Sequence, residues 1–150
     1  MKTSFSRHVN GFTLVEIMIV VAIIALIAAV AIPNLLRARH NANEGAAVGN
    51  VHTLLSGLES FRSAQTPPTY PAALTNLSTA NPPYCDSVLA GGSKQGYNFT
   101  YTRTSSSQYT LNANPTTSGV TGTRGFFADE SGVIRVNQTG AAGATDPPLE

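Results

Sequence analysis

The chain has 150 residues, of which 42% are hydrophobic and 11% are charged. Nine Lys and Arg residues stand against eight Asp and Glu residues, so no net field attracts nucleic acid, and the basic residues do not form a stripe. A single cysteine, Cys85, excludes an internal disulfide, and we expect it to be a small, partly buried side chain. Without the long apolar run near the N-terminus, about a hundred residues remain, which is enough for one small core.

A short polar leader precedes a long apolar run. Residues 1–11 are weakly basic and have no apolar core of their own, so the hydrophobic part begins after Gly11. Residues 12–32 form a 21-residue stretch that is apolar on all sides of a helix, long enough to cross about 30 Å of hydrocarbon. Small side chains recur along it at Ala22, Ala25 and Ala29, and such a stripe lets helices approach closely. The run predicts a helix that lies in lipid or among like helices.

A second helical pattern follows Pro33, which predicts a kink because proline cannot donate to the carbonyl four residues back. Apolar residues then recur three or four positions apart between Val48 and Phe61, with polar residues between them. We expect this amphipathic helix to face a core and to end near Ala64, because Thr66 and two prolines follow.

The pattern of the remaining residues predicts a loop and an antiparallel sheet. Prolines and glycines predict a surface loop over residues 66–96, with a short helical turn at residues 72–77. From residue 97 the apolar period becomes two, which predicts a sheet of three or four strands over residues 97–137 with one aromatic face. The tail, residues 138–150, lacks periodicity, and we expect it to be flexible.

No set of residues predicts catalysis, a metal site or a cofactor. His8 lies in the leader, whereas His40 and His52 are about 120° apart around a helix and do not share a ligand from one face. Asp129 and Glu130 fall in a predicted hairpin turn, where acidic residues form local hydrogen bonds. Three tripeptides match the N-glycosylation pattern, which is too short to be specific; they begin at Asn76, Asn98 and Asn137.

Glu16 is the one candidate residue whose charge requires a partner. A carboxylate inside an apolar segment is costly, and residues 17–32 contain no cation to pair with it. Cutting the chain after Gly11 would create an ammonium on Phe12, four residues from Glu16 and also within reach of a Glu16 on a neighbouring molecule. We therefore expect the Phe12 ammonium and Glu16 to direct assembly.

The segment from Gly11 through Phe12 and Glu16 to Pro33, read G-F-T-L-V-E-I-M and onward, resembles the class III leader and first helix of bacterial type IV prepilins and type II secretion pseudopilins. The resemblance covers residues 1 to about 65. It implies that a prepilin peptidase cuts between Gly11 and Phe12 and methylates Phe12, with Glu16 serving filament assembly. Two departures are an alanine at position 25, where many members have glycine, and a lone cysteine where many pilins have a disulfide. The calcium loop of the major pseudopilin is also not evident.

The resemblance further implies a lollipop-like α+β fold, a long helix packed against an antiparallel sheet. Its parts would be the leader 1–11, a transmembrane or filament-core helix 12–38 and a globular domain 39–150. The implied function is a structural, non-enzymatic subunit of a type IV pilus, a helical homopolymer. Its expected partners are the peptidase and an assembly machinery with an ATPase, and its expected location is the inner membrane and then a surface filament.

Three other hypotheses about the function remain open at this point. The chain is similar enough to pseudopilins for a role in type II secretion. Ala29, Val30 and Ala31 match an ordinary signal-peptidase site, which would release a secreted soluble binding module starting at Ile32. A membrane-anchored enzyme is the third, although no nucleophile, base and orienting group occur together.

Overall fold

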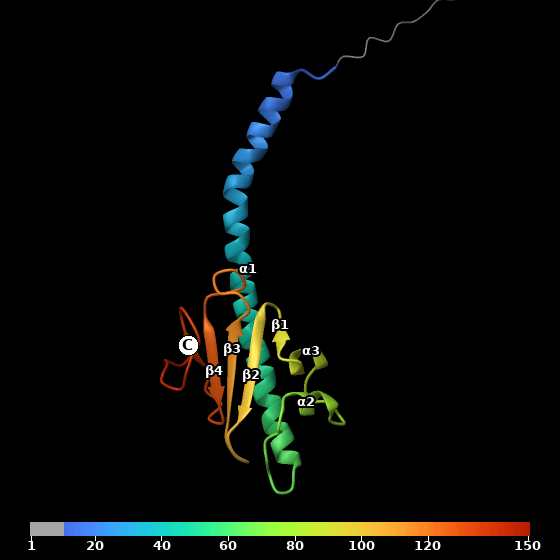
Figure 1. Cartoon of the computed structure of the whole chain (residues 1–150), viewed down its shortest axis with the longest axis vertical. Coiled ribbons are helices and arrows are strands. Elements are labelled where there is room, and N and C mark those ends of the chain that lie inside the picture. The colour runs from blue at the N-terminus through green and yellow to red at the C-terminus, as the bar shows by residue number, and fades with distance from the viewer. Residues whose placement is uncertain (1–10) are drawn as a thin grey trace, which may run out of the picture. The chain divides into compact units, whose positions relative to one another are not determined.

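The structure is a computed structural model that describes residues 11–150. Residues 1–10, which hold most of the predicted leader and His8, lie outside the described part. The chain divides into two compact units, Met1–Leu36 and Arg37–Glu150. Figure 1 shows the elements of both, and each unit is described separately below.

Helix α1, Leu14–Ala64, is the longest element. Its end at Ala64 confirms the prediction from Thr66 and the prolines behind it. Pro33 lies inside the helix. The kink predicted at Pro33 remains a prediction.

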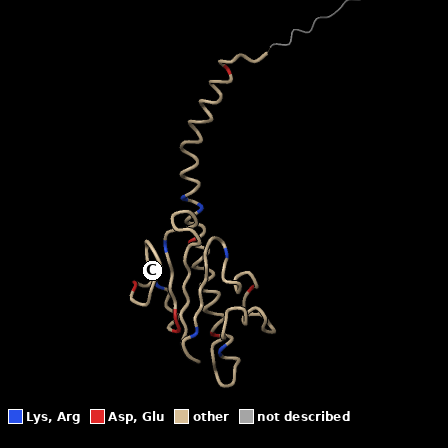
Figure 2. Tube along the Cα trace, viewed as in Figure 1, with Lys and Arg blue, Asp and Glu red and all other residues tan. Residues whose placement is uncertain are grey.

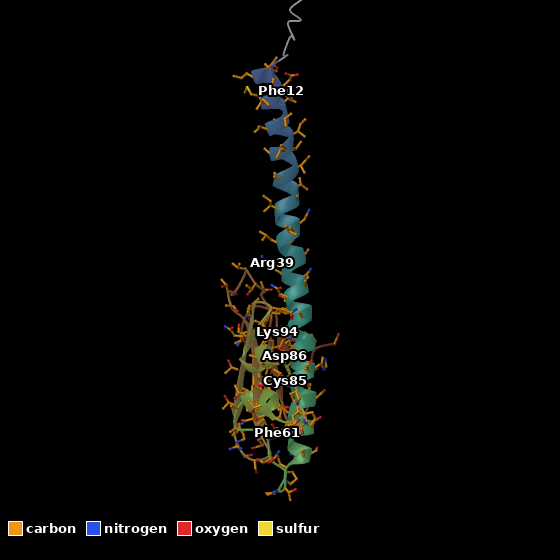
Figure 3. The ribbon with its side chains drawn as sticks, turned by 90° about the vertical axis from the view of Figure 1, so that its right-hand side faces the viewer. Phe12, Arg39, Phe61, Cys85, Asp86 and Lys94 are labelled. Carbon is orange, nitrogen blue, oxygen red and sulfur yellow. The ribbon has the colours of Figure 1, made fainter. Side chains whose placement is uncertain are left out.

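In the first unit, the side chains of α1 project on all sides and almost none is covered (Figure 3). The most apolar 18-residue window has a mean hydropathy of 3.1 and is 0% buried. By length and composition, this part of α1 is able to cross a membrane, a test that a signal sequence also passes. Charged residues are absent between Glu16 and Arg37 (Figure 2).

In the second unit, one face of α1 packs into a core. Val51, Leu54 and Leu58 are at most 1% exposed, and Val48 and Phe61 at the ends of the predicted apolar pattern are partly buried against the same core. The spacing of three and four residues puts these side chains on one face of the helix. The predicted amphipathic helix is therefore confirmed.

A five-stranded antiparallel sheet provides the other side of the core, with its strands in sequence order. The strands are β1 Ser93–Lys94, β2 Tyr97–Arg103, β3 Tyr109–Pro115, β4 Gly125–Asp129 and β5 Arg135–Asn137. Along β2 and β3 buried and exposed residues alternate, so that Tyr97, Phe99, Tyr109 and Leu111 face inward. The predicted α+β fold with an aromatic sheet face is confirmed.

The sheet has one more strand than the upper predicted number. The addition is β1, in which Ser93 and Lys94 pair with Asn98 and Tyr97. A tight turn with positive φ at Gln95 and Gly96 returns the chain onto β2. Two residues are too few to show an alternating pattern, so β1 has no periodic signal in the sequence.

The predicted loop over residues 66–96 contains two short helices. One is α2, Thr75–Thr79, displaced by about one turn from the predicted helical turn. The other is α3, Ser87–Ala90, which was not predicted from the sequence. Asp86 caps α3 by accepting a hydrogen bond from the Leu89 backbone N–H at 2.9 Å.

Residues 138–150 form hydrogen bonds along β5, and the flexibility predicted for this tail remains a prediction. The Leu149 N–H donates to the Ile134 carbonyl at 2.8 Å, and the Val136 N–H donates to the Pro147 carbonyl at 3.0 Å. Ala142 is also buried, with 6% of its surface exposed. The physical reason is that β5 is an edge strand whose free backbone groups bond to the returning tail.

Candidate functional site

The predicted cleavage point lies just outside a helix. Gly11, Phe12 and Thr13 are not helical, and α1 begins at Leu14. Phe12 is 81% exposed, and a Cβ added to Gly11 would meet no atom within 4 Å. Packing among residues 11–150 therefore does not require glycine at position 11.

Glu16 and Thr13 form a reciprocal capping box at the start of α1. The Thr13 N–H and hydroxyl both donate to the Glu16 Oε2, at 2.8 and 2.7 Å. In return the Glu16 N–H donates to the Thr13 Oγ1 at 3.2 Å. This arrangement satisfies donors that the first helical turn otherwise leaves unpaired. This capping box was not predicted above, although Thr followed by Glu three residues later is its sequence signature.

Glu16 has no ion-pair partner among the described residues, as its expected cation would exist only after cleavage. Its hydrogen bonds with Thr13 nevertheless give the carboxylate a partner within its own chain. In the single chain Glu16 therefore acts as a cap, and its predicted pairing with a neighbour's ammonium remains a prediction.

The exposed apolar surface around α1 is the largest feature of the first unit. Phe12, Leu14 and Leu26 are 69 to 81% exposed, and the same surface continues to Leu35 and Leu36. The small residues of the predicted stripe, Ala22, Ala25 and Ala29, lie within it and are exposed. An apolar patch of this size marks a surface that is covered by lipid or by another protein.

The other candidate residues do not come together. His40 and His52 lie on α1, and within residues 11–150 no group of three His, Cys, Asp or Glu residues is placed to hold a metal ion. Asp129 accepts hydrogen bonds from the backbone and hydroxyl of Ser131, which is the predicted turn role. Cys85 is a partly buried free thiol, and burial is the main cause that raises its pKa.

Two of the three glycosylation tripeptides begin at an asparagine that is already engaged in local bonding. Asn76 accepts from the Ala73 N–H at 3.0 Å, and Asn137 accepts from the Thr139 N–H at 3.1 Å. The third, Asn98, accepts from the Thr116 hydroxyl at 3.3 Å. These contacts are ordinary turn and strand interactions.

A buried ion pair is the main polar contact that sequence reasoning missed. Glu44 of α1 is 4% exposed and pairs with Arg124, with 2.6 Å between Oε2 and Nε. Burial opposes ionisation, but hydrogen bonds from Thr123 and Arg124 outweigh it, so the pKa of Glu44 lies below its ordinary value of 4.5. No local pattern pairs residues so far apart in the sequence.

Comparison with known proteins concerns mainly the N-terminal segment. Residues 6–32 match the family described as the prokaryotic N-terminal methylation motif. The chain is 63% identical over 38 residues to the type IV wide pilus major component PilA4 of Thermus thermophilus, covering 25% of this chain and 29% of that protein. No solved structure matches the chain.

Two further relatives are similar over longer stretches. The type IV major pilin protein PilA of Myxococcus xanthus is 42% identical over 59 residues, covering 39% of this chain and 27% of that protein. The type II secretion system core protein G of Aeromonas hydrophila is 32% identical over 56 residues, covering 37% of this chain and 39% of that protein. The matches thus span less than half the length of each relative. The chain thus carries the prokaryotic N-terminal methylation motif and is similar, over part of its length, to type IV pilins and to a type II secretion system core protein.

Proposed function

We propose that this chain is a structural subunit of a type IV pilus filament. It is inserted in the inner membrane as a prepilin, is cleaved after Gly11 and then polymerises through the apolar part of α1. Its role is structural and not catalytic. The observation that carries the proposal is the exposed apolar surface of α1, most of which lies inside the methylation motif.

The energetics of the apolar surface favour this sequence of events. A helix that exposes apolar side chains on every side is stable in lipid, and it loses little when lipid is replaced by the same surface of other copies. The matched shape and chemistry of identical helices let one segment serve first as an anchor and then as a filament core. The leader 1–11 keeps the precursor in the membrane, where the segment serves as an anchor.

Cleavage between Gly11 and Phe12 turns the Phe12 amide into an ammonium close to Glu16. In the single chain the Thr13 bonds hold the Glu16 carboxylate. In the filament the ammonium of a neighbouring copy, methylated on Phe12, binds Glu16 and sets the stagger between helices. Removing an unpaired charge from an apolar environment adds to the free energy of assembly.

The proposal implies partners. A membrane-embedded prepilin peptidase would process the chain, and an assembly machinery with an ATPase would extract it from the inner membrane into a surface filament. The biological use of such a filament, such as adhesion, motility or DNA uptake, depends on its exposed surface and on that machinery.

A pseudopilin of a type II secretion system is the second candidate. The similarity to the type II secretion system core protein G favours it. In that case the same processing and helix packing would build a periplasmic fibre. Loss of the chain would then abolish protein secretion and leave surface filaments unchanged.

N-terminal mass mapping of the mature protein tests the processing step. We expect a chain that begins with N-methylated Phe12. A mature chain beginning at Ile32 would instead identify an ordinary secreted protein and contradict the proposal. Imaging of purified surface filaments, with this chain identified as their bulk component, separates the pilin from the pseudopilin.

A further inference from the structure

Two arginines, Arg37 and Arg39, follow directly after the apolar part of α1. Both are exposed, and Figure 2 shows them on α1 as the first charged residues after Glu16. Every other Lys and Arg side chain of residues 11–150 has a partner: Arg62 pairs with Glu59, Lys94 with Asp86 and Arg124 with Glu44, and Arg103 and Arg135 donate to the carbonyls of Tyr70 and Asp146. Within the same residues, Arg37 and Arg39 are the two cationic side chains that have no ion pair.

The nearest carboxylates along α1 do not neutralise these two arginines. Glu16 lies 21 residues before Arg37 and is bound to Thr13. Glu44 follows Arg39, but it is 4% exposed and pairs with Arg124 at 2.6 Å. Negative charge for the two guanidinium groups must therefore come from outside these residues of the chain.

The positions of the two arginines around the helix indicate what surrounds them. Residues two apart on an α-helix are about 160° apart around its axis, so Arg37 and Arg39 project from opposite sides. The preceding Leu35 and Leu36 are also exposed, at 70% and 49%. A protein that docks on one face of the helix reaches only one of the two arginines, whereas the headgroups of a bilayer surround the helix. This arrangement favours lipid over a protein partner.

The length of the apolar part places the arginines at the level of the lipid headgroups. Leu14 to Leu36 is 23 residues of helix, which at about 1.5 Å per residue is similar to the roughly 30 Å of hydrocarbon in a bilayer. When this segment spans the hydrocarbon, Arg37 and Arg39 lie where it ends. A guanidinium binds phosphate oxygens through parallel N–H donors, and its long apolar stem extends along the adjoining hydrocarbon.

We propose that Arg37 and Arg39 bind the phosphate groups of anionic phospholipids and so fix the depth of α1 in the membrane before assembly. The inference rests on membrane insertion, which is part of the proposed function. It adds a lipid class that the subunit prefers and two contacts that must be broken when the subunit leaves the membrane. Because the two side chains project from opposite sides of the helix, each binds a separate lipid.

Native mass spectrometry of the full chain tests the lipid preference. The chain is released from detergent micelles that hold equal amounts of phosphatidylglycerol and phosphatidylcholine, and the retained lipids are counted. We expect the unaltered chain to prefer phosphatidylglycerol roughly 25-fold, because each arginine near an anionic lipid surface contributes about fivefold. The preference should fall to about fivefold in Arg37→Gln or Arg39→Gln and disappear in the double variant. The double change to lysine keeps both charges and should retain most of the preference.

The matched control is Arg103→Gln, which removes one positive charge on β2 and should leave the preference unchanged. Near-UV circular dichroism confirms that each variant is folded. Equal retention of the two lipids by the unaltered chain would overturn the proposal, and so would an unchanged preference in the folded double variant. Displacement of the lipids by a large excess of inorganic phosphate would indicate a site for free anions and would also overturn it.

Two further measurements separate this inference from its alternatives. If the arginines bind another copy of the chain, the double change to glutamine would abolish self-association and leave lipid retention unaltered, which contradicts the lipid assignment. Carbonate extraction of vesicles that hold the chain tests insertion itself. A chain that stays in the membrane but shows no preference for phosphatidylglycerol overturns only this inference, whereas a chain that is released overturns the proposed function as well.

Discussion

The two ends of helix α1 differ in what happens to their apolar side chains, which are exposed at the N-terminal end and buried at the C-terminal end. Before residue 37 the helix is more apolar than any other part of the chain, yet it buries none of that surface within the molecule. After residue 43 it is only partly apolar, yet Leu54 and Leu58 are fully buried. Burial thus follows from the presence of a second layer and not from hydrophobicity alone.

The two halves of α1 are stabilised by different surroundings. The second half is stabilised by its own aromatic core, through removal of apolar surface from water. The first half has helix-forming residues and a capping box, but its side chains need lipid or other copies of the chain. Substitutions in the first half should therefore alter filament growth, whereas substitutions in the second half should alter the free energy of unfolding.

The largest expected effect is on filament growth, from Glu16. Glu16→Gln keeps a residue that completes the capping box with Thr13 but removes the charge. We expect normal insertion, cleavage and folding of the second unit, with loss of surface filaments measured by electron microscopy. Thr13→Val is the matched variant, since it removes the cap and keeps the charge, and it should impair growth less. Normal filaments from Glu16→Gln would contradict pairing between Glu16 and Phe12.

The next largest effect compares one residue type in both halves of the helix. Leu58→Ala should lower the free energy of unfolding of the second unit by about 2 to 5 kcal/mol, because Leu58 is 0% exposed and its removal leaves a cavity. Urea unfolding of the detergent-solubilised chain, followed by near-UV circular dichroism, measures this. Leu26→Ala is the control, because Leu26 is 69% exposed. An equal loss in both variants would refute the contrast between the halves.

A smaller effect should appear as pH dependence from Glu44. Its folded pKa lies below the ordinary value of 4.5, so its stabilisation is present above that pH and is lost as the pH falls through the folded pKa. The difference in unfolding free energy between the unaltered chain and Glu44→Gln should therefore shrink between neutral pH and about pH 3. Urea titrations at several pH values measure it. A difference that stays constant over this range would argue against a buried, ionised Glu44.

The smallest effect concerns a glycine on the exposed side of α1. Gly49→Ala should stabilise the second unit by roughly 0.5 to 1 kcal/mol, because alanine favours the helix and a Cβ there meets no atom within 4 Å. Thermal unfolding of the solubilised chain measures this gain. Gly57→Ala is the comparison, because its Cβ would lie 3.4 Å from the Tyr84 carbonyl oxygen and should give a smaller gain. If Gly49→Ala destabilises the unit, the helix surface at this point is not free.

Most of the fold was predictable from patterns among residues that are close together in the sequence. The amphipathic spacing from Val48 to Phe61, the stop after Ala64 and the alternation from Tyr97 were readable because helix and strand periods are local properties of the chain. The two-residue strand β1 and helix α3 were not readable, because elements of two and four residues carry too little pattern. The residues of the candidate site, from Gly11 through Glu16 to Pro33, were also predictable, because they lie in one continuous sequence motif.

Contacts between distant residues were decided only by the tertiary structure. Glu44 looked like one more charge on a helix, and its burial depends on residues 123 and 124 lying opposite it. The tail looked flexible, and its anchoring depends on the free edge of β5. In both cases the partner group is supplied by a segment that folding brings near, so the interaction has no signature at either position alone. Local patterns in the sequence specify the apolar helix, the methylation motif and the period of each long element, whereas folding decides which polar groups hold these elements together.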